Sequence, residues 1–189
     1  MEKRQDDLHL KSRTSHMVAV LSVVFFILFG LAATPVAFAA TVNGNNRNNT
    51  LYGTSSSDTI KGNGGNDLIY GYGGRDSLYG GVGDDTIYGG TGNDKIYGWR
   101  GVNKLYGNGG NDYMISTYGC GKGESKGIAF SYTGAGHDWI IAHEDACGLE
   151  FHISGGSGND HIDVDSSPGE IWGGAGYDII TASGMWAIM

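Results

Sequence analysis

The stretch GGVGDDTIYGGTGNDKIY, residues 80–97, contains two consecutive nine-residue units with the same pattern. Each unit begins with two glycines, has aspartate at its sixth position and has isoleucine at its eighth. The same register runs without insertion from Gly44 to Ile115, which makes eight frames that all open with glycine. Position six is Asp in six frames and Asn in two, and position eight is always Leu, Ile or Met. A fixed short period of this kind is the sequence signature of a solenoid.

Nine residues provide a tight turn at positions one to six and a three-residue strand at positions seven to nine. Because side chains alternate along a strand, position eight points inward. A short turn reverses the chain, so two units form one coil and strands eighteen residues apart stack in parallel. The sequence therefore predicts an all-β fold, a right-handed parallel β-roll with two facing core stacks. One stack holds Leu51, Ile69, Ile87 and Leu105, and the other holds Ile60, Leu78, Ile96 and Met114.

The position-six carboxylates indicate a metal. One buried aliphatic side chain contributes ~1.5–3 kcal/mol, whereas ordering each backbone residue costs ~1–2 kcal/mol, so burial alone does not hold a nine-residue unit. Stacking brings position-six carboxylates to roughly 5 Å from one another, where they repel. A cation between them reverses the sign of this interaction. Carboxylate and carbonyl oxygens without Cys or His favour Ca²⁺ over zinc or copper.

Beyond Ile115 the strict register is lost, but strands and turns still alternate. We expect strands at 128–132, 139–141, 149–153, 161–164, 171–172 and 179–181. If the winding continues, one edge carries an unbroken row of aspartates, and the other binds calcium only around Asp67 and Asp85, between Asn49 and Asn103. The expected metal ligands are Asp58, Asp67, Asp76, Asp85, Asp94, Asp112, Asp138, Asp160 and Asp178.

The units GGVGDDTIY (80–88), GGTGNDKIY (89–97), GGSGNDHID (155–163) and GGAGYDIIT (173–181) resemble the RTX, or haemolysin-type, calcium-binding nonapeptide repeat. The resemblance implies that each Ca²⁺ lies between turns i and i+2, bound by position-six aspartates and turn carbonyls, and that the roll is disordered without calcium. This chain departs from relatives that carry a C-terminal export signal, because its own signal is N-terminal. That difference suggests export by a Sec-type route.

Residues 1–39 have the pattern of a signal peptide. Four basic residues lie within 1–16, residues 17–33 are apolar, and Ala37-Phe38-Ala39 is a cleavage motif. We expect an extracellular protein; the alternative is an uncleaved anchor in the membrane, with the roll on the outer face of the cell. Loss of 1–39 removes four Lys or Arg and three Asp or Glu, which changes the net charge from −8 to −9. An acidic protein of this kind is a poor nucleic-acid binder.

The remaining chain divides into a regular roll at 40–115 and a degenerate continuation at 116–189, which ends in the apolar segment GMWAIM. We expect this segment to cap the last coil. Cys120 and Cys147 fall in successive turns of the same edge, and the spacing of stacked coils suits a disulfide. We therefore predict a Cys120–Cys147 bridge between coils; the alternative is an irregular loop stapled by that bridge.

No catalytic motif is found, so we expect no enzyme. His143-Glu144 begins a sequence like HExxH, but Cys147 occupies the position of the second His. Position nine carries an outward row of tyrosines, namely Tyr52, Tyr70, Tyr79, Tyr88, Tyr97 and Tyr106. These rings either cover the sheets or form a binding face for polysaccharide or a cell surface. The expected function is that of a secreted protein that folds on binding several Ca²⁺ ions, with calcium-dependent polysaccharide or cell-surface binding as the alternative.

Overall fold

The computed structural model describes residues 38–118, 128–144, 150–165 and 169–183. The chain separates into a unit at 1–36, which lies outside these residues, and a unit at 37–189. Within the described ranges no helix is long and apolar enough to cross a membrane. The apolar segment 17–33, the cleavage motif up to Ala37, both cysteines and the segment 184–189 fall outside the described residues.

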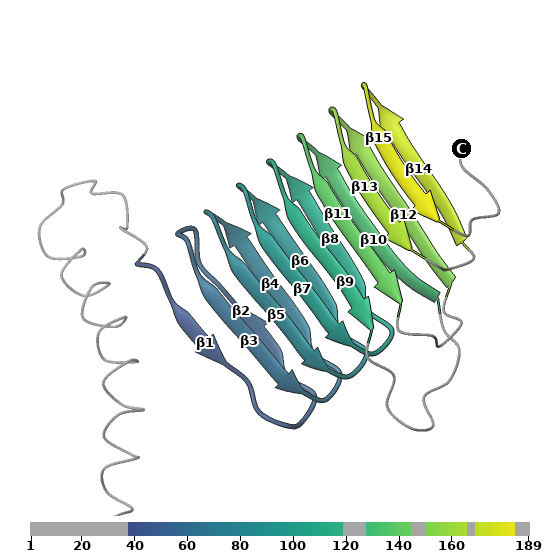
Figure 1. Cartoon of the computed structure of the whole chain (residues 1–189). Helices are drawn as coiled ribbons and strands as arrows, with labels where there is room; N and C mark the ends of the chain where they lie inside the picture. The colour runs from purple at the N-terminus through teal and green to yellow at the C-terminus, as the bar shows by residue number, and fades with distance from the viewer. Residues whose placement is uncertain (1–37, 119–127, 145–149, 166–168, 184–189) are drawn as a thin grey trace, which may run out of the picture. The chain divides into compact units, whose positions relative to one another are not determined.

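The described strands form two parallel sheets whose strands alternate along the chain (Figure 1). The odd-numbered sheet contains β1 (Thr41–Asn43), β3 (Thr59–Gly64), β5 (Ser77–Val82), β7 (Lys95–Arg100), β9 (Tyr113–Tyr118), β11 (Trp139–Glu144), β13 (His161–Asp165) and β15 (Ile179–Ser183). The even-numbered sheet contains β2 (Thr50–Tyr52), β4 (Leu68–Gly73), β6 (Thr86–Thr91), β8 (Lys104–Gly109), β10 (Ile128–Ala135), β12 (Glu150–Ser157) and β14 (Gly169–Ala175). This arrangement confirms the predicted parallel β-roll.

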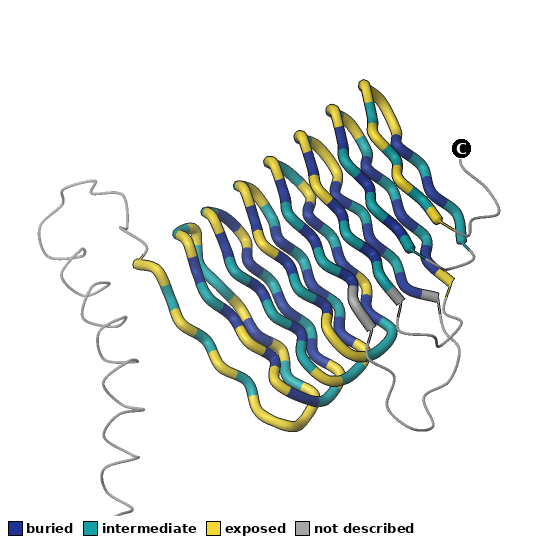
Figure 2. Tube along the Cα trace, in the orientation of Figure 1, coloured by how far each residue is buried: buried dark blue, intermediate teal, exposed yellow. Residues whose placement is uncertain are grey.

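The core follows the predicted register. Leu51 pairs with Ile69, and Ile60 pairs with Leu78, each across eighteen residues. Every position-eight side chain from Ile60 to Met114 is fully buried, and Leu51 in the first coil is 9% exposed. Figure 2 shows the resulting alternation of buried and partly exposed residues along each strand. The two predicted stacks are therefore confirmed as the hydrophobic core of residues 50–115.

The strands are longer than the sequence predicts. In the regular region most contain six residues rather than three, because pairing continues through positions one to three of the next unit. Asn63 pairs with Gly81 and Gly64 with Val82, for example, so these backbone groups stay in the ladder. The turn itself is thereby reduced to positions four to six. Position two makes this possible because its positive φ, for example 114° at Gly81, bends the chain without breaking the pairing.

The winding continues past Ile115 in the predicted manner. Met114 pairs with Ile140 and Ile140 with Ile162 in the odd-numbered sheet, while Leu105 pairs with Ser131 in the even-numbered sheet. All six strands expected after Ile115 are present among the described residues, and each is longer than predicted. The change at position 116 is therefore a change of sequence pattern and not of architecture.

Candidate metal sites along the edges of the roll

Two rows of side chains line the edges. The long row lies in the turns that lead from the even-numbered to the odd-numbered sheet. It contains Asp58, Asp76, Asp94, Asp112, Asp138, Asp160 and Asp178. The short row lies in the opposite turns and contains Asn49, Asp67, Asp85 and Asn103. All nine aspartates expected from the sequence therefore stand at the expected edges.

Each row is a hydrogen-bonded ladder. The backbone N–H of every member donates to Oδ1 of the next member, with N···O distances of 2.7–3.0 Å in the long row. The same contact joins Asn49 to Asp67 at 2.7 Å and Asp85 to Asn103 at 2.9 Å. Oδ1 of each aspartate after the first in its row thus accepts a hydrogen bond from the preceding coil. The N–H always donates toward the C-terminal end of the roll.

The second carboxylate oxygen has no hydrogen-bond donor. Seven aspartates bury Oδ2 in this way: Asp67, Asp76, Asp85, Asp94, Asp112, Asp138 and Asp160. A buried charge without a partner is strongly unfavourable. Burial accordingly raises the pKa of Asp76, Asp85 and Asp112 to about 7, helped by repulsion from neighbouring carboxylates. Burial also raises the pKa of Asp67, Asp94, Asp138 and Asp160. The rows therefore need either protons or cations.

The first glycine of each unit makes room for this carboxylate. A Cβ on Gly71 would collide with Oδ2 of Asp76 in its own turn and with the carbonyl oxygen of Gly89 in the next coil. At Gly53 the corresponding distances, to Asp58 Oδ2 and Gly71 O, are both 2.6 Å. Neither glycine has a positive φ that would by itself require glycine. The invariant first position is therefore a steric requirement of the aspartate row.

The donor set fits a hard cation. Each coil contributes one carboxylate to each occupied edge, and no group of three or more His, Cys, Asp or Glu side chains gathers in the part of the chain that is described. An ion between coils would therefore take its remaining ligands from main-chain carbonyls, which the turns supply in number. Oxygen ligands of both kinds at flexible positions are the set that Ca²⁺ accepts and that zinc and copper do not favour.

Both rows begin with residues whose own contacts replace a cation. At Asp58, Oδ2 accepts a hydrogen bond of 2.5 Å from the N–H of Thr54, and Oδ1 accepts one from Ala40 N–H. At Asn49, Oδ1 accepts the N–H of Asn45. The position-six pattern alone does not distinguish Asp58 from the aspartates further along the row. The Thr-Ser run that follows Gly53 was the available signal, because its hydroxyl and N–H groups are close enough to cap the carboxylate.

The short row ends at Asn103, whose Nδ2 donates to Trp99 O at 3.2 Å. The Asn103 amide therefore accepts a hydrogen bond through Oδ1 and donates one through Nδ2. Because it carries no charge, it needs no cation. Beyond it, pairing places Ala129, Phe151 and Gly169 in the column that aspartate occupied. Where position six loses its aspartate, position one on the same edge loses its glycine and is occupied by Ser116, Ala142 and Val164.

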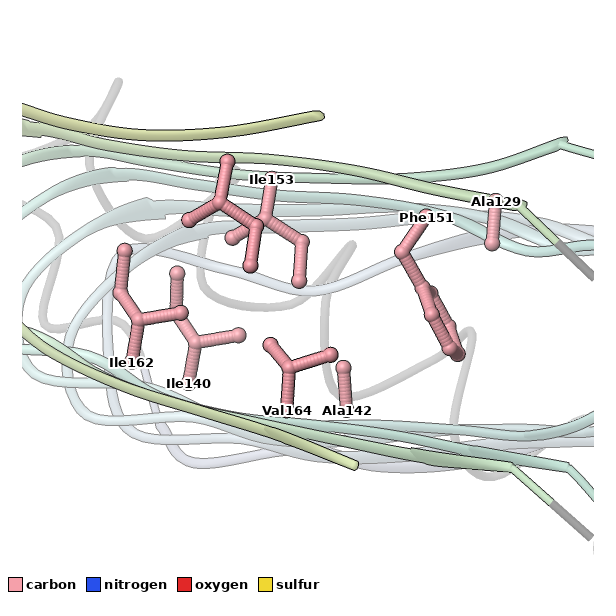
Figure 3. Packing of buried hydrophobic residues seen from close by; sticks show 8 residues of the cluster. Ala129, Ile140, Ala142, Phe151, Ile153, Ile162 and Val164 are labelled. Carbon is pink, nitrogen blue, oxygen red and sulfur yellow. The ribbon is translucent and has the colours of Figure 1, made fainter. Parts of the chain in front are cut away.

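Most of the described side chains at the edge beyond Asn103 are apolar. Ala129, Ala142, Phe151 and Val164 are all buried, and Figure 3 shows the Phe151 ring extending from its strand across to the side of Val164 and Ala142. Hydrophobic packing therefore takes the place of a carboxylate row in this part of the edge. The sequence predicted that calcium ligands were missing here and that a Cys120–Cys147 disulfide took their place; both cysteines lie outside the described residues. The loss of glycine at position one was the sequence signal that side chains fill the space that a carboxylate occupies in the other turns.

A comparison with protein-family models identifies the repeats independently of the structure. The sequence model of the RTX calcium-binding nonapeptide repeat matches residues 43–78, 79–114 and 152–166. These segments are RTX calcium-binding nonapeptide repeats. Two of the matched segments cover β2–β8 and the start of β9, and the third covers most of β12 and β13, so the family pattern coincides with coils of the observed roll. No curated protein and no solved structure is similar to the chain at a significant level.

The tyrosine row of this RTX roll lies on the outer faces, as predicted. In the even-numbered sheet Tyr52, Tyr70, Tyr88, Tyr106 and Tyr132 stack with ring centroids 4.7–5.6 Å apart and planes within 13° of parallel. In the odd-numbered sheet Tyr79 stacks on Tyr97 at 4.9 Å. The ring faces are therefore turned toward one another, and solvent meets mainly the ring edges. This geometry gives the row a role in holding neighbouring coils together.

Proposed function

We propose that this RTX protein is a secreted, non-enzymatic calcium-binding protein whose roll folds when Ca²⁺ enters between the stacked turns. One observation supports the proposal above others: seven buried aspartate oxygens lack a donor while the other oxygen of each carboxylate is satisfied. The nine aspartates of the two rows are the proposed ligands. Asp58 is the weakest candidate because Thr54 and Ala40 already hold its oxygens.

Binding and folding are coupled for a simple thermodynamic reason. The unfolded chain has no preformed set of oxygens, so an ion that binds the folded roll stabilises it in proportion to its free concentration. Without the ion, the inner carboxylates must be protonated or remain as unpaired buried charges. A protein with this property would stay unfolded where calcium is scarce and fold where it is abundant, as outside cells. The signal-like pattern of residues 1–39 and the proposed Cys120–Cys147 disulfide agree with such a destination.

The decisive experiment is a Ca²⁺ titration of residues 40–189 followed by far-ultraviolet circular dichroism, with Mg²⁺ as the control. We expect β-structure to appear cooperatively with Ca²⁺ and not with Mg²⁺ at the same concentrations, because Mg²⁺ requires a tighter octahedral site. An unchanged spectrum across the Ca²⁺ titration would refute calcium-coupled folding. Mass spectrometry of the exported protein, with and without reductant, tests cleavage after Ala39 and the disulfide.

A further inference from the structure

Among the described residues, four that are not glycine have left-handed backbone angles, and all four stand at position two of a unit. They are Asn63, Tyr72, Trp99 and Asn108, with φ between 67° and 77°. Several other units place glycine at this position with a positive φ, as at Gly81 and Gly90. Asparagine tolerates the left-handed region, but a bulky aromatic residue adopts it only at an energetic penalty. Tyr72 and Trp99 are also more than half exposed, so burial does not compensate for that penalty.

Trp99 forms one wall of a groove on the outer face of the odd-numbered sheet. The groove encloses about 420 Å³, which lies in the range of small-ligand sites. Its lining also includes Lys61, Asn63, Tyr79 and Val82, over a floor formed by the glycines at 80 and 81. Val82 and Trp99 are 54% and 56% exposed, so both apolar surfaces are available to a ligand.

The groove results from a missing side chain at one of three paired positions on neighbouring strands. Asn63, Gly81 and Trp99 are consecutive partners on β3, β5 and β7. Because Gly81 has no side chain, the space between Asn63 and Trp99 is open over two strand spacings, roughly 10 Å. After the thickness of the indole and the amide is allowed for, this gap accepts one ring.

The side chains that line the groove determine which kind of ring it favours. An indole face packs against the C–H bonds of a pyranose, and the Asn63 amide retains an acceptor and a donor beside its bond to Gly44 O. Lys61 extends over Tyr79, with its Nζ 5.8 Å from the ring centroid. The outward positions of β3, β5 and β7 carry Lys61 and Lys95 and no acidic residue, although the whole chain has a net charge of −8. This local charge favours an anionic ligand.

We propose that the groove at Trp99 binds a pyranose ring that carries a carboxylate, as found in acidic polysaccharides. The indole of Trp99 packs on the sugar ring, Lys61 pairs with the carboxylate, and Asn63 hydrogen-bonds a hydroxyl group. The site rests on the proposed function, because the three strands come into register only in the calcium-stabilised roll. It assigns polysaccharide recognition to this groove and not to the tyrosine row, whose ring faces cover one another.

The even-numbered sheet offers a matched control. Tyr72, Gly90 and Asn108 are consecutive partners there and repeat the same column pattern. The Tyr72 ring, however, stacks on Tyr52 and Tyr70 with centroids 6.2 and 6.1 Å away. Its aromatic surface is thus engaged within the protein, so Tyr72→Gly should leave sugar binding unchanged.

The test is calorimetric titration of the calcium-saturated full chain, kept in solution by a detergent without a sugar headgroup. The probes are uronic-acid trisaccharides of gluco, galacto, manno and gulo configuration, with their neutral methyl esters as controls. We expect at least one acid to bind and its ester to bind about tenfold more weakly. Trp99→Gly and Lys61→Met should each weaken binding by about tenfold or more. Circular dichroism at the same calcium concentration establishes that each protein is folded.

Trp99→Gly separates recognition from folding because glycine relieves the left-handed strain. This variant should fold at the same or a lower calcium concentration and still lose the sugar. The proposal is overturned if the folded protein binds none of the acids, if Trp99→Gly binds as well as the native chain, or if Tyr72→Gly weakens binding equally. A failure of calcium-coupled folding would be visible in the spectra alone, so the two proposals fail in different measurements.

Discussion

The backbone N–H of Asp76 donates to Oδ1 of Asp94 across one coil, at 2.8 Å. The contact fixes the Asp94 side chain and leaves its Oδ2 buried without a donor. Each inner aspartate thus has a structural oxygen and an oxygen available to a cation. Because the relation repeats from coil to coil, the occupancy of one calcium site affects the coils on both sides, which favours cooperative folding.

Neutralising a buried row member should impair calcium-dependent folding more than neutralising its exposed neighbour. Asp85→Asn removes one charged ligand, while the amide still accepts the bond from Asp67 N–H. The loss of a charged contact of about 1.5–3 kcal/mol should raise the calcium midpoint of folding roughly tenfold or more. Asp84→Asn is the control, since Asp84 is exposed and its Oδ1 accepts the N–H of Val102 in the next coil. Equal midpoints for the two variants would contradict the assignment.

Calcium-free protein should fold better in mild acid than at neutral pH. Burial raises the pKa of Asp76, Asp85 and Asp112 to about 7, above the usual 3.8. A group whose pKa is higher in the folded state stabilises that state below the unfolded pKa, and this contribution is lost as the pH rises through the folded pKa. β-structure measured in chelator should therefore decrease between about pH 4 and pH 7.

The same linkage predicts that calcium displaces protons. The calcium midpoint should fall as the pH increases from 5 to 8, and proton release on binding should be measurable in buffers of different ionisation enthalpy. A midpoint that does not change with pH would mean that the row carboxylates are already ionised in the calcium-free fold.

Adding one methyl group at the first position of a unit should disturb the row. Gly71→Ala places a Cβ against Asp76 Oδ2 and Gly89 O, and overpacking of this kind costs about 1–3 kcal/mol. Gly109→Ala is the matched control, because its nearest contact would be Gly90 O at 3.9 Å and its φ is not positive. Urea unfolding at saturating calcium should show a clearly lower free energy of unfolding for Gly71→Ala. For Gly109→Ala the free energy of unfolding should change by no more than about 0.5 kcal/mol.

Truncating Phe151 should destabilise the roll independently of calcium. Its ring is buried in the apolar edge, and Phe→Ala changes in cores cost about 3–5 kcal/mol. The midpoint of urea unfolding should decrease at saturating calcium, and extra calcium should not restore it. Phe130→Ala, on the outer face against Tyr132 and His152, should have a smaller effect. A loss that calcium fully rescues would show that Phe151 acts through the metal rows instead.

The asymmetry of the two edges was predictable, but its physical basis was only partly so. The alternation of turns after Ile115 placed Asp138, Asp160 and Asp178 on the long row, and the structure confirms it. The short row was expected to stop near Asp85 with a disulfide as its substitute. The described residues reveal apolar packing around Phe151 at that edge, while Cys120 and Cys147 lie outside them.

The sequence by itself determined the period, the inward position-eight side chains and the edges on which the aspartates lie. Strand alternation and an eighteen-residue coil follow from local geometry, and each repeat restates them. The tertiary structure decided which oxygen of each carboxylate is left without a donor, why Asp58 and Asn103 close the rows, and where Gly81 leaves room beside Trp99. These features depend on contacts between residues eighteen or more positions apart, whose relative orientation no single repeat specifies.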